Sequence, residues 1–99
     1  MPSYDLRIQR SARRELDNLT ADQRDRLTSV LSDVSHVRKP TSHEKVAPLE
    51  GQDGLLRVRV GDVRAVVELQ APVLRVLRCG HRSTVYDAVD DLDERRVSA

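Results

Sequence analysis

The feature of this sequence that most constrains its fold is a run of three strand-like segments joined by very short links. Residues 55–60, 63–69 and 73–79 are rich in valine and leucine, and only the dipeptide Gly61-Asp62 and residues 70–72 separate them. Links of two or three residues allow antiparallel pairing and are too short for the crossover that parallel strands need. We therefore expect residues 55–79 to form an antiparallel three-stranded meander.

A strand and a helix are expected well before the meander. Apolar side chains alternate with polar ones at Tyr4, Leu6 and Ile8, which is the period of a half-buried strand. Ser11 is the predicted N-cap of a helix that follows over residues 12–19.

A second helix is expected to follow directly. Thr20 and Gln23 have the spacing of a capping box, in which each residue bonds to the backbone of the other. The helix has an apolar stripe made by Leu27, Val30, Leu31, Val34 and Val37. Residues 38–54 contain two prolines and two glycines without any periodicity, so we expect a loop there.

The order of these elements predicts a small α+β domain of the form β-α-α-β-β-β. In it, a two-helix hairpin packs on one face of a mainly antiparallel sheet. A chain of 99 residues is enough for one such domain, spanning residues 1–99. The acidic C-terminal tail, residues 87–99, is expected to add a last helical turn or two, with Val85, Val89 and Leu92 on one face.

Composition narrows the compartment and the kinds of site. The single cysteine, Cys79, excludes an internal disulfide and a cysteine-built metal site. The sequence contains neither the apolar core of a signal peptide nor the roughly 20 apolar residues of a membrane span. We therefore expect a soluble, cytoplasmic protein that has no membrane partner.

Charge is sorted along the chain, although the formal net charge is only +1. Residues 55–86 contain six arginines and two acids, whereas residues 87–99 contain five acids and two arginines. Arg57 and Arg59 share one face of the first meander strand, and the next strand can bring Arg64 beside them. The pattern predicts an open, cationic sheet face on the side away from the helices.

The same residues carry a family resemblance. The stretch KVAPLEGQDGLLRVRVGDVRAVVEL contains an Arg-x-Arg-x-Gly-Asp-x-Arg hairpin, and VLRVLRCGHRSTVY adds a third strand, Gly-His-Arg and a tyrosine four residues after that arginine. This combination resembles the RelE branch of the RelE/ParE toxin superfamily. The likeness covers nearly the whole chain, because the first strand and the SARREL helix also match the opening of the family.

The resemblance implies the toxin of a type II toxin-antitoxin pair. Such a toxin is a ribosome-dependent mRNA endonuclease that uses no metal or cofactor and stops translation through 2′-hydroxyl attack on the phosphodiester. The implied partners are a cognate antitoxin, the ribosome and mRNA, and a heterotetramer or a larger complex with the antitoxin is compatible with it. Carried over residue by residue, the family's site falls on Arg57, Arg59, Arg64, Arg82 and Tyr86.

The chemistry of RNA cleavage fits this set in outline. Attack by the 2′-hydroxyl needs a base, fixed positive charge on the developing phosphorane and an acid for the leaving oxygen. Guanidinium suits the second task because its planar fork matches phosphate oxygens. Arginine is a poor base, and this chain has Arg57 and Arg59 where the family often has lysine. The proton transfer is therefore open between His81, Tyr86 and a site distributed over several groups.

Two other functions fit the pattern. A ParE-like protein would share the fold and inhibit DNA gyrase by protein contact, but the Gly-His-Arg and tyrosine ending argues against it. A non-catalytic or decayed RelE-fold module would only bind nucleic acid through its phosphates.

The charged residues also have structural interpretations. Arg64 and Arg82 could form salt bridges with Asp62, Glu68 or the acidic tail. Arg75 and Arg78 are expected to be peripheral, and the charges of SARREL to face solvent. The acidic tail is expected to act as a weak lid that competes with RNA for the arginine face.

Overall fold

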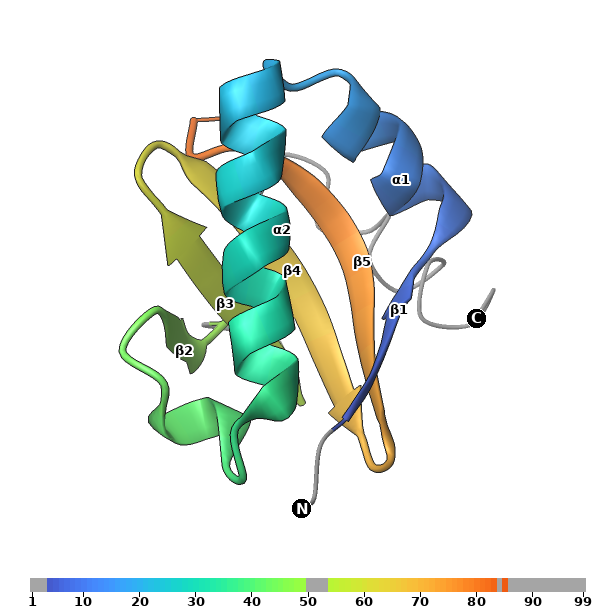
Figure 1. Cartoon of the computed structure of the whole chain (residues 1–99), viewed down its shortest axis with the longest axis vertical. Helices are drawn as coiled ribbons and strands as arrows, with labels where there is room; N and C mark the ends of the chain where they lie inside the picture. Colours follow the sequence, from blue (N-terminus) through green and yellow to red (C-terminus); the bar gives the residue numbers. More distant parts are fainter. Residues whose placement is uncertain (1–3, 50–53, 84, 86–99) are drawn as a thin grey trace.

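Two helices cover one face of a five-stranded mixed sheet in the computed structural model, which describes residues 4–49, 54–83 and 85 (Figure 1). The strands lie side by side in the order β1-β5-β4-β3-β2. In chain order the elements are β1 (Asp5–Ile8), α1 (Arg10–Asp17), α2 (Ala21–His36), the 3-10 helix η1 (Pro40–Ser42), β2 (Val46–Pro48), β3 (Leu55–Val60), β4 (Val63–Gln70) and β5 (Val73–His81). The expected α+β class, with both helices on one face of a mainly antiparallel sheet, is confirmed.

The meander forms as its short links require. Strands β3 and β4 pair up to Val60 and Val63, and Gly61 takes a φ of 60° in the turn between them. Glycine adopts this left-handed conformation without the clash that a Cβ would cause. Strands β4 and β5 also pair antiparallel, but the register shifts at Leu77, since Val66 faces Arg78 and Val67 faces Val76. The strand bounds agree with the sequence prediction to within two residues.

The N-terminal strand completes the sheet from the other side. β1 pairs parallel with the first half of β5, with Asp5 opposite Val73 and Ile8 opposite Val76. Beyond this pairing α1 lies along the edge of β5 (Figure 1). There the carboxylate of Glu15 accepts a hydrogen bond of 3.1 Å from the backbone N–H of Cys79. This backbone N–H lies on an edge of β5 where no other strand pairs, and the side chain of Glu15 accepts its hydrogen bond instead.

The two helix starts differ in how well the sequence indicates them. The capping box of α2 is present, with distances of 3.2 Å both from Gln23 N to Thr20 Oγ1 and from Thr20 N to Gln23 Oε1. The prediction that Ser11 caps α1 is wrong, because this helix begins at Arg10 and has no side-chain cap. The backbone N–H of the preceding Gln9 bonds instead to the Val76 carbonyl at 3.0 Å, so pairing with β5 determines where the helix begins.

The predicted loop over residues 38–54 is wrong in part. It contains η1 and a short strand, β2, which pairs antiparallel with β3 and sets Val46 opposite Val58. The side chain of Val46 is buried in the main core. A strand of three residues is too short to show a period of two, and the edge of β3 is what stabilises it.

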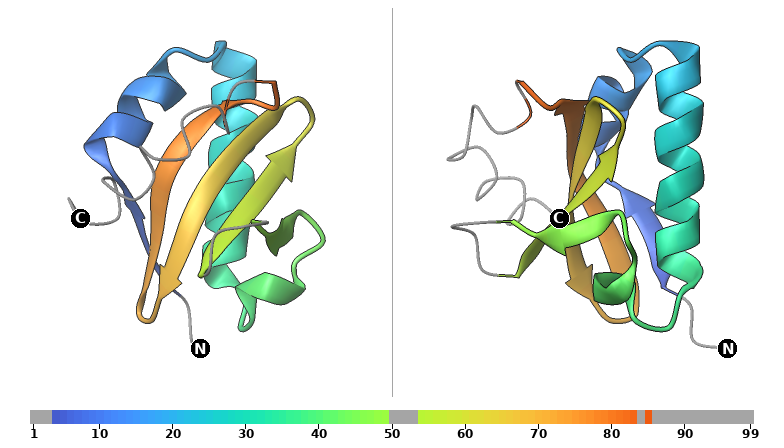
Figure 2. Two further views of the ribbon diagram at one scale, coloured as in Figure 1. Left: turned by 180° about the vertical axis from the view of Figure 1, so that it is seen from behind. Right: turned by 90° about the vertical axis from the view of Figure 1, so that its left-hand side faces the viewer.

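Apolar residues fill both faces of the sheet. The main core lies between helices and sheet and includes Leu16, Leu27, Leu31, Val34, Val58, Val67 and Val76, while Val30 packs against it (Figure 2). A second, smaller cluster on the opposite face consists of Leu55, Val66, Leu77 and Val85, with Leu49 against it. The expectation of an open, cationic sheet face is therefore wrong in part, because the centre of that face is a buried apolar cluster.

Two further predictions concern the ends of the chain. Val85 is buried, as expected for an inward-facing residue, whereas Tyr86 and the acidic tail lie outside the described residues. In the part of the chain that the structure describes, no helix is long and apolar enough to span a bilayer.

Candidate nucleic-acid interface

The β3–β4 hairpin brings three arginines together on the face away from the helices. Arg57 and Arg59 alternate with core residues of β3 and are exposed. Arg59 stands directly opposite Arg64 of β4, and Arg57 stands opposite Val66 of the apolar cluster. Side chains that face each other across antiparallel strands have Cβ atoms about 5 Å apart. The hairpin thus presents a compact cationic surface next to a buried apolar cluster.

The guanidinium of Arg64 is held by the hairpin itself. Its Nη1 donates to the Gly61 carbonyl at 2.6 Å and to the Val63 carbonyl at 3.0 Å. Among the described residues no carboxylate is paired with Arg64. The salt bridge to Asp62 or Glu68 that the sequence allowed for Arg64 is therefore not formed. A guanidinium has five N–H donors, and these two bonds leave most of them for a ligand.

Arg82 lies at the same turn, although it follows β5. Its backbone N–H donates to the Asp62 carbonyl at 2.8 Å, and its Nε lies 3.7 Å from the Asp62 carboxylate. The two side chains are 68% and 74% exposed. An ion pair this exposed contributes about 0–1 kcal/mol to stability. The salt bridge expected between Arg82 and Asp62 is therefore present. It contributes too little stability to explain why position 82 is an arginine.

His81 lies on the other face of the sheet. It pairs with Val63, whose side chain belongs to the main core, and residues directly opposite on antiparallel strands share a face. Together with Glu15 and Leu19, His81 lines a cavity of about 240 Å³ beside the end of α1. The structure thus gathers Arg57, Arg59, Arg64 and Arg82 at one end of the hairpin and sets His81 apart from the first three.

Comparison with solved structures finds the same architecture. The toxin-antitoxin complex RelBE2 from Mycobacterium tuberculosis aligns with a TM-score of 0.69 and 25% identity over 84% of this chain and 95% of that chain. An archaeal RelE-RelB complex from Pyrococcus horikoshii gives 0.67 and 24% over 84% and 99%. A mutant of the E. coli toxin RelE in the free state gives 0.70 and 18% over 97% and 96%. This chain has the RelE-type toxin fold. No protein-family model and no curated protein sequence matches it.

Within this RelE-type fold, two arginines differ from their prediction as peripheral charges. Arg75 lies 3.6 Å from the carboxylate of Glu68, and both are largely buried, with side chains 22% and 6% exposed. Arg78 is also largely buried and lies 3.9 Å from Glu15, so the charges of SARREL do not all face solvent. When the strand pairs are counted from the β4–β5 turn, Glu68 lies opposite Arg75. The sequence therefore already contained the information that these two charged residues face each other.

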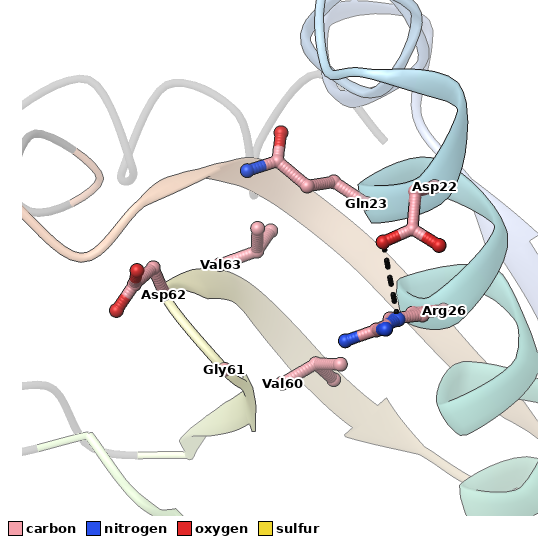
Figure 3. A pocket seen from close by; sticks show the side chains of 7 residues that line it. All are labelled: Asp22, Gln23, Arg26, Val60, Gly61, Asp62 and Val63. Carbon is pink, nitrogen blue, oxygen red and sulfur yellow. Dashed lines mark ion pairs between the residues drawn. The ribbon is translucent and has the colours of Figure 1, made fainter.

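A polar cavity lies on the helix side of the same hairpin turn (Figure 3). It has a volume of about 240 Å³ and is lined by residues 60–63 and by Asp22, Gln23 and Arg26 of α2. Asp22 and Arg26 pair with each other at 3.2 Å. In Figure 3 the carboxylate of Asp62 points away from α2. No group of three or more metal-ligating side chains is found among the described residues of this RelE-type domain.

Proposed function

We propose that this protein is the toxin of a type II toxin-antitoxin system and that it cleaves mRNA on the ribosome. The observation that carries the proposal is the placement of Arg59 directly opposite Arg64 on an exposed sheet face. Like charges in this position destabilise a sheet, so the fold gains nothing from the pair. An RNA phosphate would relieve the repulsion, because it supplies the missing negative charge.

In the proposed reaction the arginines act on the phosphate. The 2′-hydroxyl attacks the adjacent phosphorus, and Arg57, Arg59, Arg64 and Arg82 would bind its oxygens and stabilise the charge that develops on the phosphorane. Guanidinium keeps its charge throughout, so a metal is not needed for this step. Tyr86 and His81 stay the candidates for proton transfer, and His81 would have to reach the phosphate from the other face of the sheet, at the end of β5.

The proposed partners follow from the neighbours and from the charge. RelBE2 from M. tuberculosis and the P. horikoshii protein were solved as toxin-antitoxin complexes, which supports a cognate antitoxin for this chain. An antitoxin segment that carries acidic side chains would complement the hairpin arginines. The ribosome would supply the RNA, and electrostatic attraction would speed that encounter.

The first test is induction of the protein without an antitoxin, followed by separate measurement of protein and DNA synthesis. We expect protein synthesis to stop first and mRNA to be cut within ribosomes. A block of DNA synthesis with continued translation would instead indicate a ParE-like gyrase inhibitor. Growth without any arrest would indicate a non-catalytic module.

The second test uses purified protein on programmed ribosomes. We expect Arg64→Ala to slow mRNA cleavage by about 10²- to 10³-fold, because it removes a preorganised charge from the developing oxyanion. Arg13→Ala, a substitution of an exposed arginine on α1, is the matched control and should cleave like the wild type. Equal losses in both variants would mean that general electrostatic binding explains the activity.

A further inference from the structure

We propose that Asp62 is a positioning residue for Arg82, holding its guanidinium at Nε so that the two terminal nitrogens face the RNA phosphate. The inference rests on the proposed nuclease function and adds a residue that neither the sequence patterns nor the comparisons assign to the site.

The contacts of Asp62 single it out. Its backbone carbonyl accepts from Arg82 N, and its carboxylate lies 3.7 Å from Arg82 Nε. Both the backbone and the side chain of Arg82 therefore contact the same residue of the turn. In the described part of the chain, Asp62 is the one carboxylate paired with any of the four hairpin-end arginines, Arg57, Arg59, Arg64 and Arg82.

The atom that the carboxylate approaches determines what Arg82 can still do. Nε lies on the inner side of the guanidinium, and the terminal nitrogens carry four of its five N–H donors. A carboxylate at Nε leaves those terminal donors for a bidentate contact with phosphate oxygens. The neighbouring Arg64 is held differently, through a terminal nitrogen: its Nη1 donates to two turn carbonyls, and Nη2 and Nε stay available. The residues of one turn, 61–63, thus anchor both arginines.

The strength of the pair fits a positioning role better than a stabilising one. An exposed ion pair adds little to the stability of the fold. Its effect on the rate is direct, because a guanidinium that leaves its productive orientation no longer stabilises the developing charge. At the same time the negative charge of Asp62 weakens the attraction of the surface for RNA. Its removal should therefore slow the chemical step without weakening binding.

The experiment is single-turnover cleavage of mRNA on programmed ribosomes over a range of protein concentrations. Asp62→Asn removes the charge and keeps a residue that suits turns, so the hairpin is expected to form. Asp62→Glu restores the carboxylate. Asp22→Asn is the matched control, because Asp22 forms an ion pair with Arg26 at 3.2 Å, is similarly exposed and lines the cavity at the same turn (Figure 3).

We expect Asp62→Asn to lower the rate at saturation by about 2- to 5-fold, because an exposed ion pair favours the productive orientation of the guanidinium by no more than this factor. The half-saturating concentration should be unchanged or lower. Asp62→Glu should recover most of the rate, and Asp22→Asn should equal the wild type. In an Arg82→Ala background, Asp62→Asn should have no further effect. Wild-type rates in Asp62→Asn, or an equal loss in Asp22→Asn, would overturn the inference.

A second readout does not depend on cleavage. The ¹⁵N relaxation of Arg82 Nε, measured by NMR in the free protein, should show an ordered side chain in the wild type and a mobile one in Asp62→Asn. An unchanged signal would overturn the positioning role. If the wild-type protein cuts no mRNA, the proposed function fails, and this spectrum still decides whether Asp62 orients Arg82.

Discussion

Arg59 occupies a position at which its charge does not favour the fold. It faces Arg64 across the β3–β4 pairing, where opposite-sign or neutral pairs are more stable. We predict that Arg59→Thr raises the free energy of unfolding by about 0.2–1 kcal/mol, because the repulsion disappears and threonine suits a strand. The same variant should cleave mRNA more slowly. Urea denaturation and the ribosome assay measure the two effects.

Arg57→Thr is the control for this prediction. Arg57 is exposed on the same strand but faces Val66, so its replacement relieves no direct repulsion. We expect its stability to change less than that of Arg59→Thr. A similar gain in both variants would indicate strand propensity, not charge repulsion, as the cause.

Arg75 has the opposite role, since its charge supports the fold. Arg75→Ala would leave the largely buried carboxylate of Glu68 without its arginine and should lower the free energy of unfolding by about 1–2 kcal/mol. Adding Glu68→Gln to this variant should recover part of the loss, because the amide carries no charge to bury. Urea denaturation of the single and double variants checks both statements. A stability of Arg75→Ala equal to that of the wild type would contradict the structural role.

The arginines show what sequence can indicate at this scale. Alternation along β3 was enough to place Arg57 and Arg59 on one face, and a two-residue turn was enough to place Arg64 beside them. Burial of Arg78 was not predictable, because it depends on α1 lying beside β5. The position of His81 on the opposite face was not predictable from alternation, because the register shift at Leu77 reverses the alternation over the rest of β5.

At the scale of elements, the capping box of α2 can be tested by replacing threonine with alanine at the cap and, separately, within the helix. The two replacements should affect stability differently. Thr20→Ala should lower the free energy of unfolding by about 1 kcal/mol, because it removes the cap of the Gln23 N–H. Thr28→Ala should leave stability unchanged or raise it slightly. Thr28 is exposed within α2 and bonds back to the Arg24 carbonyl, and alanine has the higher helix propensity. An unchanged melting temperature in Thr20→Ala would show that the cap is not formed.

The elements that the sequence predicted correctly are those defined by local chemistry. The capping box defined the start of α2, and the short turns defined the meander almost to the residue. The elements that it missed depend on distant partners: β2 pairs with an edge of β3, and the start of α1 depends on a hydrogen bond to β5. Local periodicity contains no information about such contacts.

At the scale of the whole molecule, the sorted charge leads to a prediction about the acidic tail. Truncation after Asp87 removes four acids and two arginines and so changes the formal charge from +1 to +3. It keeps Val85, which is buried on the sheet. We propose that the shortened protein stays folded and binds RNA more tightly at low salt, and that high salt removes the difference. Fluorescence anisotropy with a labelled RNA at two salt concentrations measures this effect.

A large loss of melting temperature together with lost activity would contradict the lid and assign the tail a stabilising role. The second apolar cluster makes this outcome worth measuring, because the sequence predicted an open, cationic face there and the structure buries part of it. Leu55, Val66 and Leu77 occupy positions of the same parity as the arginines. They were recognisable as apolar, but which residues cover them depends on the path of the chain after β5.

The parallel pairing of β1 with β5 has a consequence for how the protein is made. β1 can pair only after the first half of β5 has been made, so the sheet cannot be completed until residues up to Val76 have left the exit tunnel. Contacts so distant in sequence form late in folding. A nascent chain therefore lacks a complete sheet until β5 is available. If the protein poisons ribosomes as proposed, no copy can become active before the ribosome that builds it has made β5.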